Sequence, residues 1–417
     1  MTDSPRTELD PRRVDGARLW GRLMEMATIG PGVAGGSNRQ AISDEDAAGR
    51  ELFTGWASAA GCTIAMDRIV NLFVRRAGTD PDRAPVMTGS HLDTQPTGGR
   101  FDGVYGVLAG LEVIERLDEL GVETAAPIEV AVWTNEEGSR FPHSMMGSGV
   151  WAGALDLEGA YELTDRSGIS VGDELQRLGW IGELPAEARP LTAYLELHIE
   201  QGPILEEAEV EIGVVTAGQG YRWYELELRG FPAHAGPTPM PGRRDPAQAI
   251  ARIITRVHEA TDDLAPWARA PFAQLSSEPA TPHTLPAVVR CTLALRPPAL
   301  EVLDELEGRM REAVGAVCAD LRVDADVRVL SASAPVAFDP ATVDVVRSSA
   351  TGLGCSAIDI VSGAGHDACQ VAAVAPTAMI FVPCLDGLSH NEAEDITPEQ
   401  AERGASVLLE AMRRLAA

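Results

Sequence analysis

Residues 84–138 read APVMTGSHLDTQPTGGRFDGVYGVLAGLEVIERLDELGVETAAPIEVAVWTNEEG. An apolar run ends at a histidine and an aspartate, a glycine-rich turn follows, and residues 104–120 have the apolar spacing of a helix that Gly121 ends. A second apolar run, residues 128–134, leads into two adjacent glutamates. Strand, helix and strand in this order are typical of an α/β fold, in which function gathers at the carboxyl ends of the strands.

The rest of the chain predicts two domains, since 417 residues exceed the size of a usual single core. Apolar runs at residues 69–74, 191–197 and 377–382 predict strands, and residues 14–28, 44–60, 342–352 and 398–415 predict helices. Between them, strand-like residues 221–229, 288–295 and 323–330 alternate with helical residues 246–260 and 300–320. We therefore expect a larger α/β/α domain formed by residues 1–216 and 332–417, with a smaller α+β domain, residues 217–331, inserted in it.

Composition and charge exclude several classes of partner. The net charge of -28 argues against binding to nucleic acid and to anionic membranes. The most apolar stretch, residues 371–385, contains Pro376 and Pro383 and is too short to span a bilayer. The polar start of the chain has no apolar signal region, and the six cysteines form no CxxC pair, so we expect reduced thiols in a cytoplasmic protein.

Familiar enzyme motifs are mostly missing from the sequence. Residues 30–35, GPGVAG, match the spacing GxGxxG, but they follow a helix and not a strand, so we do not expect a dinucleotide site. The chain contains neither GxSxG nor HExxH, which argues against a serine hydrolase or a zincin.

Five segments instead carry histidines and carboxylates where apolar runs end. They supply three imidazoles and two carboxylates, namely His91, Asp102, Glu137, His198 and His390. Zinc, manganese, cobalt and nickel accept such mixed ligands, and a two-metal site needs a carboxylate that bridges the ions. We predict two divalent metal ions, bridged by Asp102 or by Glu137.

Two further carboxylates lie next to these candidate ligands. Glu136 precedes Glu137 in the loop after a strand, where it can hold the attacking water and pass its proton to a leaving amine. Asp93 lies two residues after His91, close enough for its side chain to orient the second ring nitrogen. We expect both to be catalytic residues.

The ordered set of motifs resembles one group of the M20 metallopeptidase family, the amidase, hydantoinase and carbamoylase group. That group includes N-carbamoyl-L-amino acid hydrolases, β-ureidopropionases and allantoate amidohydrolases. The resemblance runs from residue 41 to residue 394 and is carried by SHLDT (90–94), GGRFDG (98–103), ELHIEQGP (196–203), HAGPTPM (234–240) and GLSHNEAE (387–394).

The resemblance implies roles for individual residues. His91, Asp102, Glu137, His198 and His390 would be metal ligands with Asp102 bridging, and Glu136 would be the general base for attack by metal-bound hydroxide. Gln201 would lie near the substrate, Gly365 would line the site, and Arg296 would pair with a substrate carboxylate. His234 would stabilise the oxyanion across a homodimer interface, and the inserted domain would act as lid and dimerisation domain.

Two positions depart from the family pattern in the substrate pocket. His283 stands where the family usually has the asparagine that holds the substrate carboxylate, and Ala294 stands where an aspartate is common. These departures favour the hypothesis that the substrate is not a plain N-carbamoyl-α-amino acid.

The expected activity is metal-dependent hydrolysis of a C–N bond in an N-carbamoyl amino acid or related ureido compound. The alternatives are an allantoate-type amidohydrolase, an N-deacylase or peptidase with an altered pocket, and a catalytically silent binding protein. His366 and Asp367 either support the site or cap a helix. His143 and His258 belong to no group of candidate ligands, so we expect them to be structural.

Overall fold

The structure is a computed structural model that describes residues 10–180, 182–264, 268–297 and 300–417. The chain forms two compact units: Met1–Gly218 with Ala337–Ala417, and Gln219–Val336. The α/β architecture with a second, smaller unit agrees with the predicted fold class. The lid and dimerisation roles given to residues 217–331 remain predictions.

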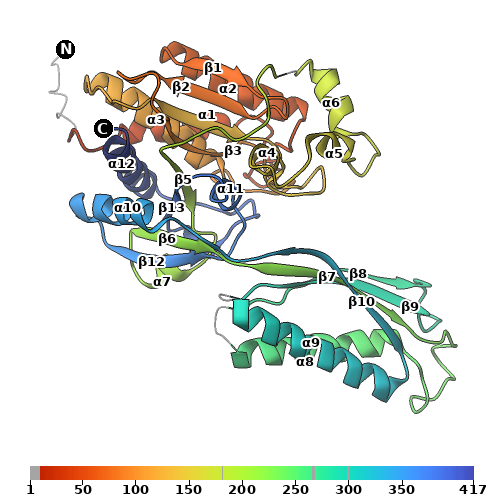
Figure 1. The fold of residues 1–417 in the computed structure, drawn as a ribbon. Helices are drawn as coiled ribbons and strands as arrows, with labels where there is room; N and C mark the ends of the chain where they lie inside the picture. The colour runs from red at the N-terminus through yellow and green to blue at the C-terminus, as the bar shows by residue number, and fades with distance from the viewer. Residues whose placement is uncertain (1–9, 181, 265–267, 298–299) are drawn as a thin grey trace. The chain divides into compact units, whose positions relative to one another are not determined.

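A nine-stranded mixed sheet forms the centre of the larger unit, in the order β1-β2-β4-β3-β5-β13-β6-β11, with β12 beside β6 (Figure 1). Strand β3 is parallel to both β4 and β5, and β13 is parallel to β5. The carboxyl ends of these four strands therefore lie at one edge of the sheet, where α/β proteins form their sites. The strands are β1 (Thr63–Met66), β2 (Leu72–Arg76), β3 (Val86–His91), β4 (Ile128–Trp133), β5 (Ala193–Ile199), β6 (Ile212–Gly218), β11 (Val336–Ala337), β12 (Ala357–Ser362) and β13 (Thr377–Val382).

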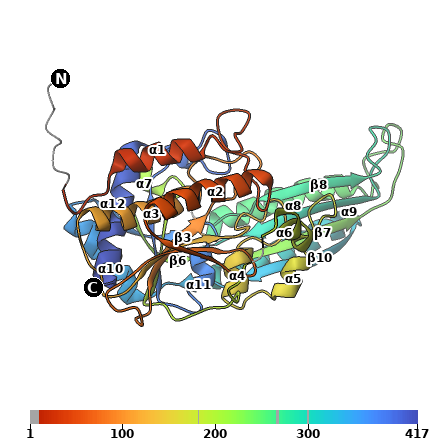
Figure 2. The same ribbon diagram turned by 90° about the horizontal axis from the view of Figure 1, so that it is seen from above.

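Helices cover both faces of this sheet, so its central strands are buried along their whole length. Figure 2 shows α1 and α3 on one side of the sheet and α4 and α11 on the other. Helix α12 packs on α3 and β5, and α11 packs on β5 and β13. The helices are α1 (Gly16–Met26), α2 (Asp44–Ala59), α3 (Val104–Glu119), α4 (Met146–Trp151), α5 (Leu157–Glu162), α6 (Val171–Leu178), α7 (Ile204–Glu207), α10 (Pro340–Gly352), α11 (Asp367–Val371) and α12 (Pro398–Leu415), with a 3-10 turn η1 (Leu385–Gly387).

Local sequence signals explain where several helices begin. Ser43 caps α2 by accepting the Asp46 N–H, and Thr397 and Gln400 form a capping box on α12. Gly103, at φ 69°, turns the chain between Asp102 and the first residue of α3, Val104. Among the described residues, no helix is both long and apolar enough to cross a bilayer.

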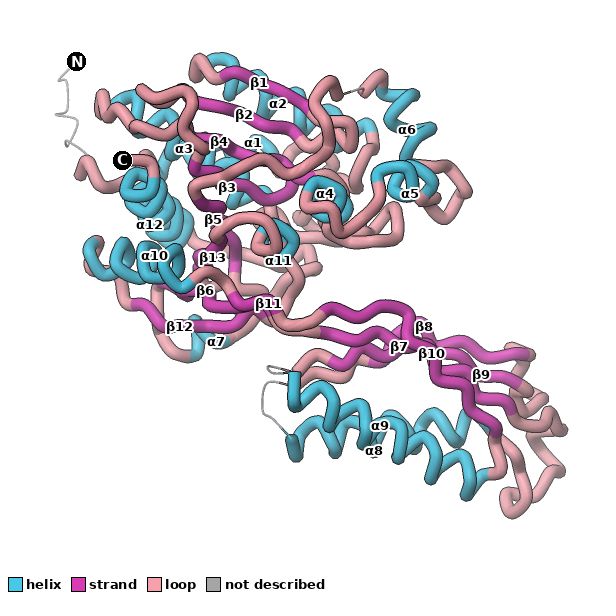
Figure 3. Tube along the Cα trace, in the orientation of Figure 1, coloured by secondary structure: helices cyan, strands magenta, loops and turns pink. Residues whose placement is uncertain are grey.

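The smaller unit is a four-stranded antiparallel sheet with two helices on one face (Figure 3). Its strand order is β10-β7-β9-β8, and α8 and α9 pack against each other and against alternate residues of β7 and β9, such as Leu226 and Leu293. The elements are β7 (Tyr221–Arg229), α8 (Pro246–Leu264), β8 (Phe272–Glu278), β9 (Val288–Leu295), α9 (Leu300–Leu321) and β10 (Asp324–Ser333).

Residues 69–71 were wrongly predicted as strand, and several elements of the structure, strand β8 among them, were not predicted. Residues 69–71 are not strand, because Val70 adopts φ 61° and packs with Ile69 in a side cluster around Phe141, so β2 begins only at Leu72. Strand β8 was not predicted, since most of its residues are exposed and it has no apolar alternation.

The close packing of α3 on the sheet can be tested at Gly106, with Gly55 of α2 as the comparison. A Cβ on Gly106 would lie 2.3 Å from the Leu197 carbonyl oxygen, whereas a Cβ on Gly55 of α2 would meet nothing within 4 Å. We expect Gly106→Ala to lower the free energy of unfolding by roughly 1–3 kcal/mol, and Gly55→Ala to raise it by about 0.5–1 kcal/mol. Denaturant unfolding of both variants checks this, and a stabilised Gly106→Ala protein contradicts the close approach.

Candidate metal-binding active site

The candidate site lies at the carboxyl edge of the large sheet, where four parallel strands place residues that are far apart in sequence. His91 is the last residue of β3, and His198 is the penultimate residue of β5. The loop after β4 carries Glu136 and Glu137, and the loop after β13 carries His390. Parallel alignment of the strands therefore gathers these side chains around Asp102, which lies two residues before the start of α3.

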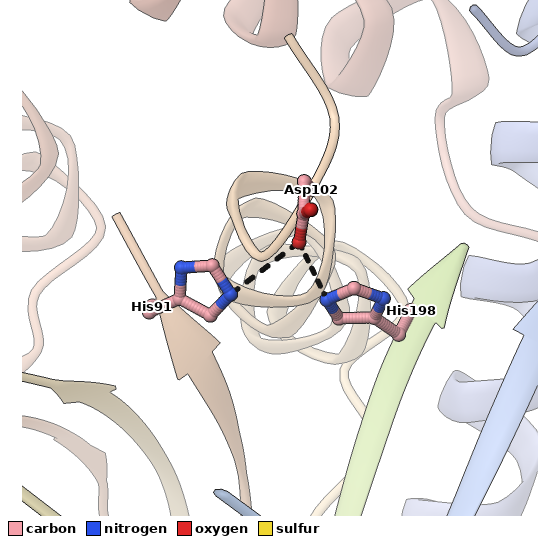
Figure 4. Close-up of side chains that lie close together, drawn as sticks. All are labelled: His91, Asp102 and His198. Atoms are coloured by element: carbon pink, nitrogen blue, oxygen red, sulfur yellow. Dashed lines mark ion pairs between the residues drawn. The ribbon is translucent and has the colours of Figure 1, made fainter. Parts of the chain in front are cut away.

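Asp102 lies at the centre of the group and is almost fully buried. Its Oδ1 is 3.5 Å from His91 Nε2 and 3.1 Å from His198 Nε2 (Figure 4). Its Oδ2 is 3.5 Å from His390 Nε2. Two groups with metal-ligand spacing result, one of His91, Asp102 and His198 and one of Asp102, Glu137 and His390, and they share only Asp102. Of the two carboxylates considered as the bridge, Asp102 has this position.

Both buried imidazoles turn one defined nitrogen toward Asp102. His91 Nδ1 lies 2.9 Å from the Asp93 carbonyl oxygen, and His198 Nδ1 lies 2.9 Å from the Ile199 carbonyl oxygen. A carbonyl only accepts, so each Nδ1 carries a hydrogen and each Nε2 is left to face the carboxylate. The Gly103 N–H also donates to His198 Nε2, which suits a lone pair at that nitrogen.

This donor set needs a positive charge between its members. Burial alone would raise the pKa of Asp102, but the His198 and His91 rings hold it well below its ordinary value. Burial lowers the pKa of His91, yet the carboxylates of Glu136 and Asp102 outweigh it and raise that pKa well above the usual value. Protons on the rings or divalent cations can supply this charge, and a histidine and carboxylate set of this kind fits zinc, manganese, cobalt or nickel.

The second group is more open to solvent. Glu137 Oε2 lies 3.2 Å from His390 Nε2 and accepts from the Gln95 amide at 2.8 Å. His390 adopts φ 53°, and its side chain is 52% exposed. The hydrogen bond with Glu137 raises the pKa of His390 to about 9. This histidine is therefore protonated at neutral pH whenever no cation displaces the proton.

Glu136 and Glu137 converge because Asp93 holds the backbone between them. The two oxygens of the Asp93 carboxylate accept from the N–H groups of Glu136 and Glu137 at 3.3 and 3.2 Å. The predicted contact of the Asp93 side chain with the His91 ring was wrong, because the Asp93 carbonyl makes that contact. Glu136 Oε2 lies 3.6 Å from His91 Nε2, and burial raises the pKa of Glu136 well above its ordinary value.

Three polar residues support Asp102: Gln201, which the sequence placed near the substrate, and Ser389 and Glu394, which it did not single out. Gln201 donates to Asp102 Oδ2 at 2.8 Å, and Ser389 Oγ lies 2.9 Å from the same oxygen. The Glu394 carboxylate accepts from the N–H groups of Phe101 and Asp102. Burial, with the charge of Asp102, raises the pKa of Glu394 to about 7. Gln201 Oε1 is buried and has no hydrogen-bond partner among the described residues.

The loop before α11 contacts the back of the site. The His366 ring lies 4.6 Å from the His198 ring and bonds Ser362 through Nε2, so it supports the site and its side chain does not cap the helix. Asp367 accepts from Ser148 Oγ. A Cβ on Gly365 would come within 3.1 Å of Met145. Glu196 forms a third group of metal-ligand spacing with His198 and His366, but it already accepts from Ser90 and from the Ala368 N–H.

The smaller unit holds the remaining predicted residues at two separate places. Exposed His234 and His283 lie together, since the Ala235 N–H donates to the His283 carbonyl at 2.9 Å. Arg296 follows the other end of β9 and lies over the rings of Tyr221 and Trp223. The eight residues of β9 span about 26 Å. His234 and Arg296 of one chain are therefore too far apart to contact one amino-acid-sized molecule.

The two remaining histidines lie outside these groups. The exposed His143 has its Nδ1 3.2 Å from the neighbouring Ser144 carbonyl oxygen, and His258 contacts the Ala270 carbonyl and the Phe272 ring. All six cysteines are free thiols, and four of them are buried.

The fold and the site together are those of a metal-dependent hydrolase with an α/β fold. Its histidines and carboxylates lie at the carboxyl ends of parallel strands. The chain belongs to peptidase family M20/M25/M40, whose family model matches residues 87–414.

Similar proteins cover almost the whole chain. An N-carbamoyl-L-amino-acid amidohydrolase of Rhizobium meliloti is 49% identical over 96% of this chain and 96% of its own length. An allantoate amidohydrolase of Bacillus subtilis is 33% identical over 86% of this chain and 88% of its own. The crystal structure of an amidase of the hydantoinase/carbamoylase family from Burkholderia multivorans superposes with a TM-score of 0.91, at 51% identity, over 98% of this chain and 99% of that one.

The protonated state of His390 predicts a pH-dependent cation affinity. A cation held by Asp102, Glu137 and His390 must displace the ring proton, whose pKa is about 9. Binding at pH 7 should therefore release a proton, and the affinity should rise at least about tenfold per pH unit up to about pH 9. Calorimetric titration in buffers of different ionisation enthalpy measures this release. His143→Ala should leave it unchanged, and an affinity that is constant from pH 7 to 9 contradicts the prediction.

Proposed function

We propose that this protein hydrolyses the C–N bond of the carbamoyl group in N-carbamoyl-L-amino acids. The observation that carries the proposal is Asp102 shared between two groups of candidate ligands, with the buried Glu136 carboxylate beside His91. The 49% identity to an N-carbamoyl-L-amino-acid amidohydrolase over nearly the whole chain supports this substrate class.

We propose two divalent cations as cofactors, one held by His91, Asp102 and His198 and the other by Asp102, Glu137 and His390. The facing lone pairs of the donor set fit such ions, and zinc, manganese, cobalt and nickel all accept these ligands. When bound, they would polarise the carbamoyl carbonyl and lower the pKa of a water molecule, so that its deprotonated form is available to attack the carbonyl carbon.

Glu136 is the proposed proton carrier. Its carboxylate is buried beside His91, and a carboxyl group with a raised pKa can take a proton from the attacking water and give it up again. That proton goes to the nitrogen of the amino acid as the C–N bond breaks. The products are the free amino acid and carbamate, which decomposes to carbon dioxide and ammonia.

Substrate contacts are proposed for residues of both units. Arg296, held over two aromatic rings, can bind a carboxylate in a bidentate manner. Gln201 Oε1, buried without a partner among the described residues, can accept an N–H of the substrate. The Gly236 N–H donates to His234 Nδ1, so the neutral ring carries its hydrogen on Nε2, which can donate to an oxyanion. Gly365 would line the site near Met145.

The separation of His234 and Arg296 supports the proposal of a homodimer. Because His234 and Arg296 lie beyond opposite ends of β9, which spans about 26 Å, a small substrate that contacts both must receive them from two copies. We therefore propose a homodimer in which each site takes Arg296 from one chain and His234, with His283, from its partner. A cytoplasmic location also remains a proposal.

Allantoate is the second candidate substrate, favoured by the 33% identity to an allantoate amidohydrolase. The departures at His283 and Ala294, which favour a substrate other than a plain N-carbamoyl-α-amino acid, also support this second candidate. Ala294 is fully buried and pairs with Trp223 across the sheet, so a larger acidic side chain would not fit there without displacing the ring on which Arg296 lies.

A substrate panel tests the activity. Protein loaded with manganese, cobalt or zinc should hydrolyse N-carbamoyl-L-amino acids, and Glu136→Gln should lower kcat by about 10²–10⁴-fold while the metal content stays the same. The panel also contains N-carbamoyl-β-alanine, allantoate, N-formyl and N-acetyl amino acids and dipeptides. Turnover of allantoate alone supports the second candidate, and turnover of acyl or peptide substrates alone contradicts both.

Hybrid dimers test the shared site. His234→Ala and Arg296→Ala proteins should each be nearly inactive, but mixing and reassembly in equal amounts should restore about a quarter of the wild-type activity, because half of the dimers then hold one intact site. Mixing His234→Ala with His283→Ala provides the control: both changes remove a residue from the same end of the sheet, so no intact site forms. Activity that never recovers in the first mixture contradicts the shared site.

A further inference from the structure

Two glutamates in the loop after β13 have no role in the proposed chemistry, although they lie two and four residues beyond His390. Each accepts hydrogen bonds from backbone N–H groups of a different glycine-rich segment. Glu392 contacts the segment of residues 33–36, and Glu394 contacts Phe101 and Asp102. Hydrogen bonds therefore hold the loop that carries His390 to two other parts of the larger unit.

Glu394 connects this loop to both the backbone and the side chain of Asp102. Its Oε1 accepts from the N–H groups of Phe101 and Asp102, each at 3.0 Å. Its Oε2 lies 3.1 Å from Ser389 Oγ, which is also 2.9 Å from Asp102 Oδ2. A Cβ on Gly99 would lie 2.0 Å from the Glu394 carboxylate, so only glycine leaves room for it.

Glu392 is held in a nest of backbone amides. Its Oε2 accepts from the N–H groups of Ala34 and of Gly36, the latter at 3.1 Å. A Cβ on Gly32 would lie 2.3 Å from this oxygen, and a Cβ on Gly36 would lie 2.7 Å from the Glu392 Cα atom. Consecutive amides that converge in this way form an anion site. The GxGxxG spacing at residues 30–35 therefore accommodates a carboxylate of this same chain.

Besides the contact of its ring with Glu137, His390 depends on the hydrogen bonds of its loop for its position. Its backbone adopts φ 53°, a region that residues other than glycine seldom occupy, and half of its side chain is exposed. Asp102 and Ser389, the residue next to His390, are 287 residues apart in the sequence. The distance between His390 and Asp102 therefore depends on contacts between distant segments and not on local backbone geometry.

We propose that Glu392 and Glu394 are positioning residues that together set the spacing between His390 and Asp102, and thereby the affinity for the cation held by Asp102, Glu137 and His390. This inference rests on the proposed function, in which two cations bind and share Asp102. Residues that orient metal ligands in this way typically change metal affinity by 10–100-fold when they are mutated.

Titration of the metal-free protein with Co²⁺, followed by the visible absorption of the ion, separates the two binding steps. We expect Glu394→Ala and Glu392→Ala to weaken the second step by about 10–100-fold, with a smaller effect on the first. Glu394→Gln should largely restore it. The glutamine carbonyl can accept from both amides, while its NH₂ donates to Ser389, whose hydroxyl then donates to Asp102. Glu392→Gln should likewise keep the nest contacts. The control is Glu399→Gln, an exposed glutamate of α12, which should match the wild type.

The outcomes separate this inference from the proposed function. If the wild type binds no second Co²⁺, the two-cation site itself is wrong. If the wild type binds two ions and both alanine variants bind the second with unchanged affinity, the positioning role is overturned and the two-cation site stands. Thermal unfolding of each metal-free variant shows whether the alanine proteins remain folded. If they do not, the comparison of the glutamine variants with the wild type decides: a loss of 10-fold or more in the second step for both contradicts the hydrogen-bond explanation.

Discussion

Burial of carboxylates without loss of their hydrogen bonds is the constraint on which this site depends. A carboxylate that leaves water must find donors or a positive charge, or folding becomes costly. Here fixed backbone N–H groups supply many of the donors: those of Glu136 and Glu137 for Asp93, and those of Phe101 and Asp102 for Glu394. Each of these bonds also fixes the position of a backbone segment that carries a reactive side chain.

Asp102 differs from the other buried carboxylates because imidazoles take the place of most of its donors. Backbone carbonyls hold the Nδ1 hydrogens of His91 and His198, which leaves both Nε2 atoms facing the same oxygen. Positive charge at this point relieves the repulsion between lone pairs, so proton and metal ion compete for one position. The stability of the site and its chemistry thus depend on the same charge.

Much of the fold and of the candidate site could be predicted, for physical reasons that differ between elements. Strand β13 and helix α12 have the predicted bounds, because an apolar run bounded by prolines and a capping sequence are local signals. The role of the Asp93 side chain was wrong, since its direction depends on where the loop after β4 lies. Glu394 drew no prediction because its partners are almost three hundred residues away in sequence.

By itself the sequence determined the residue types, their order and the strand ends at which they occur, because apolar periodicity and ligand chemistry are properties of short segments. Only the tertiary structure decided which oxygen of Asp102 faces which histidine, and that Glu392 fills the glycine-rich loop of residues 30–36. It also placed His234 and Arg296 at opposite ends of one sheet. These relations arise from the pairing of distant strands and loops, and a linear pattern contains no distance between them.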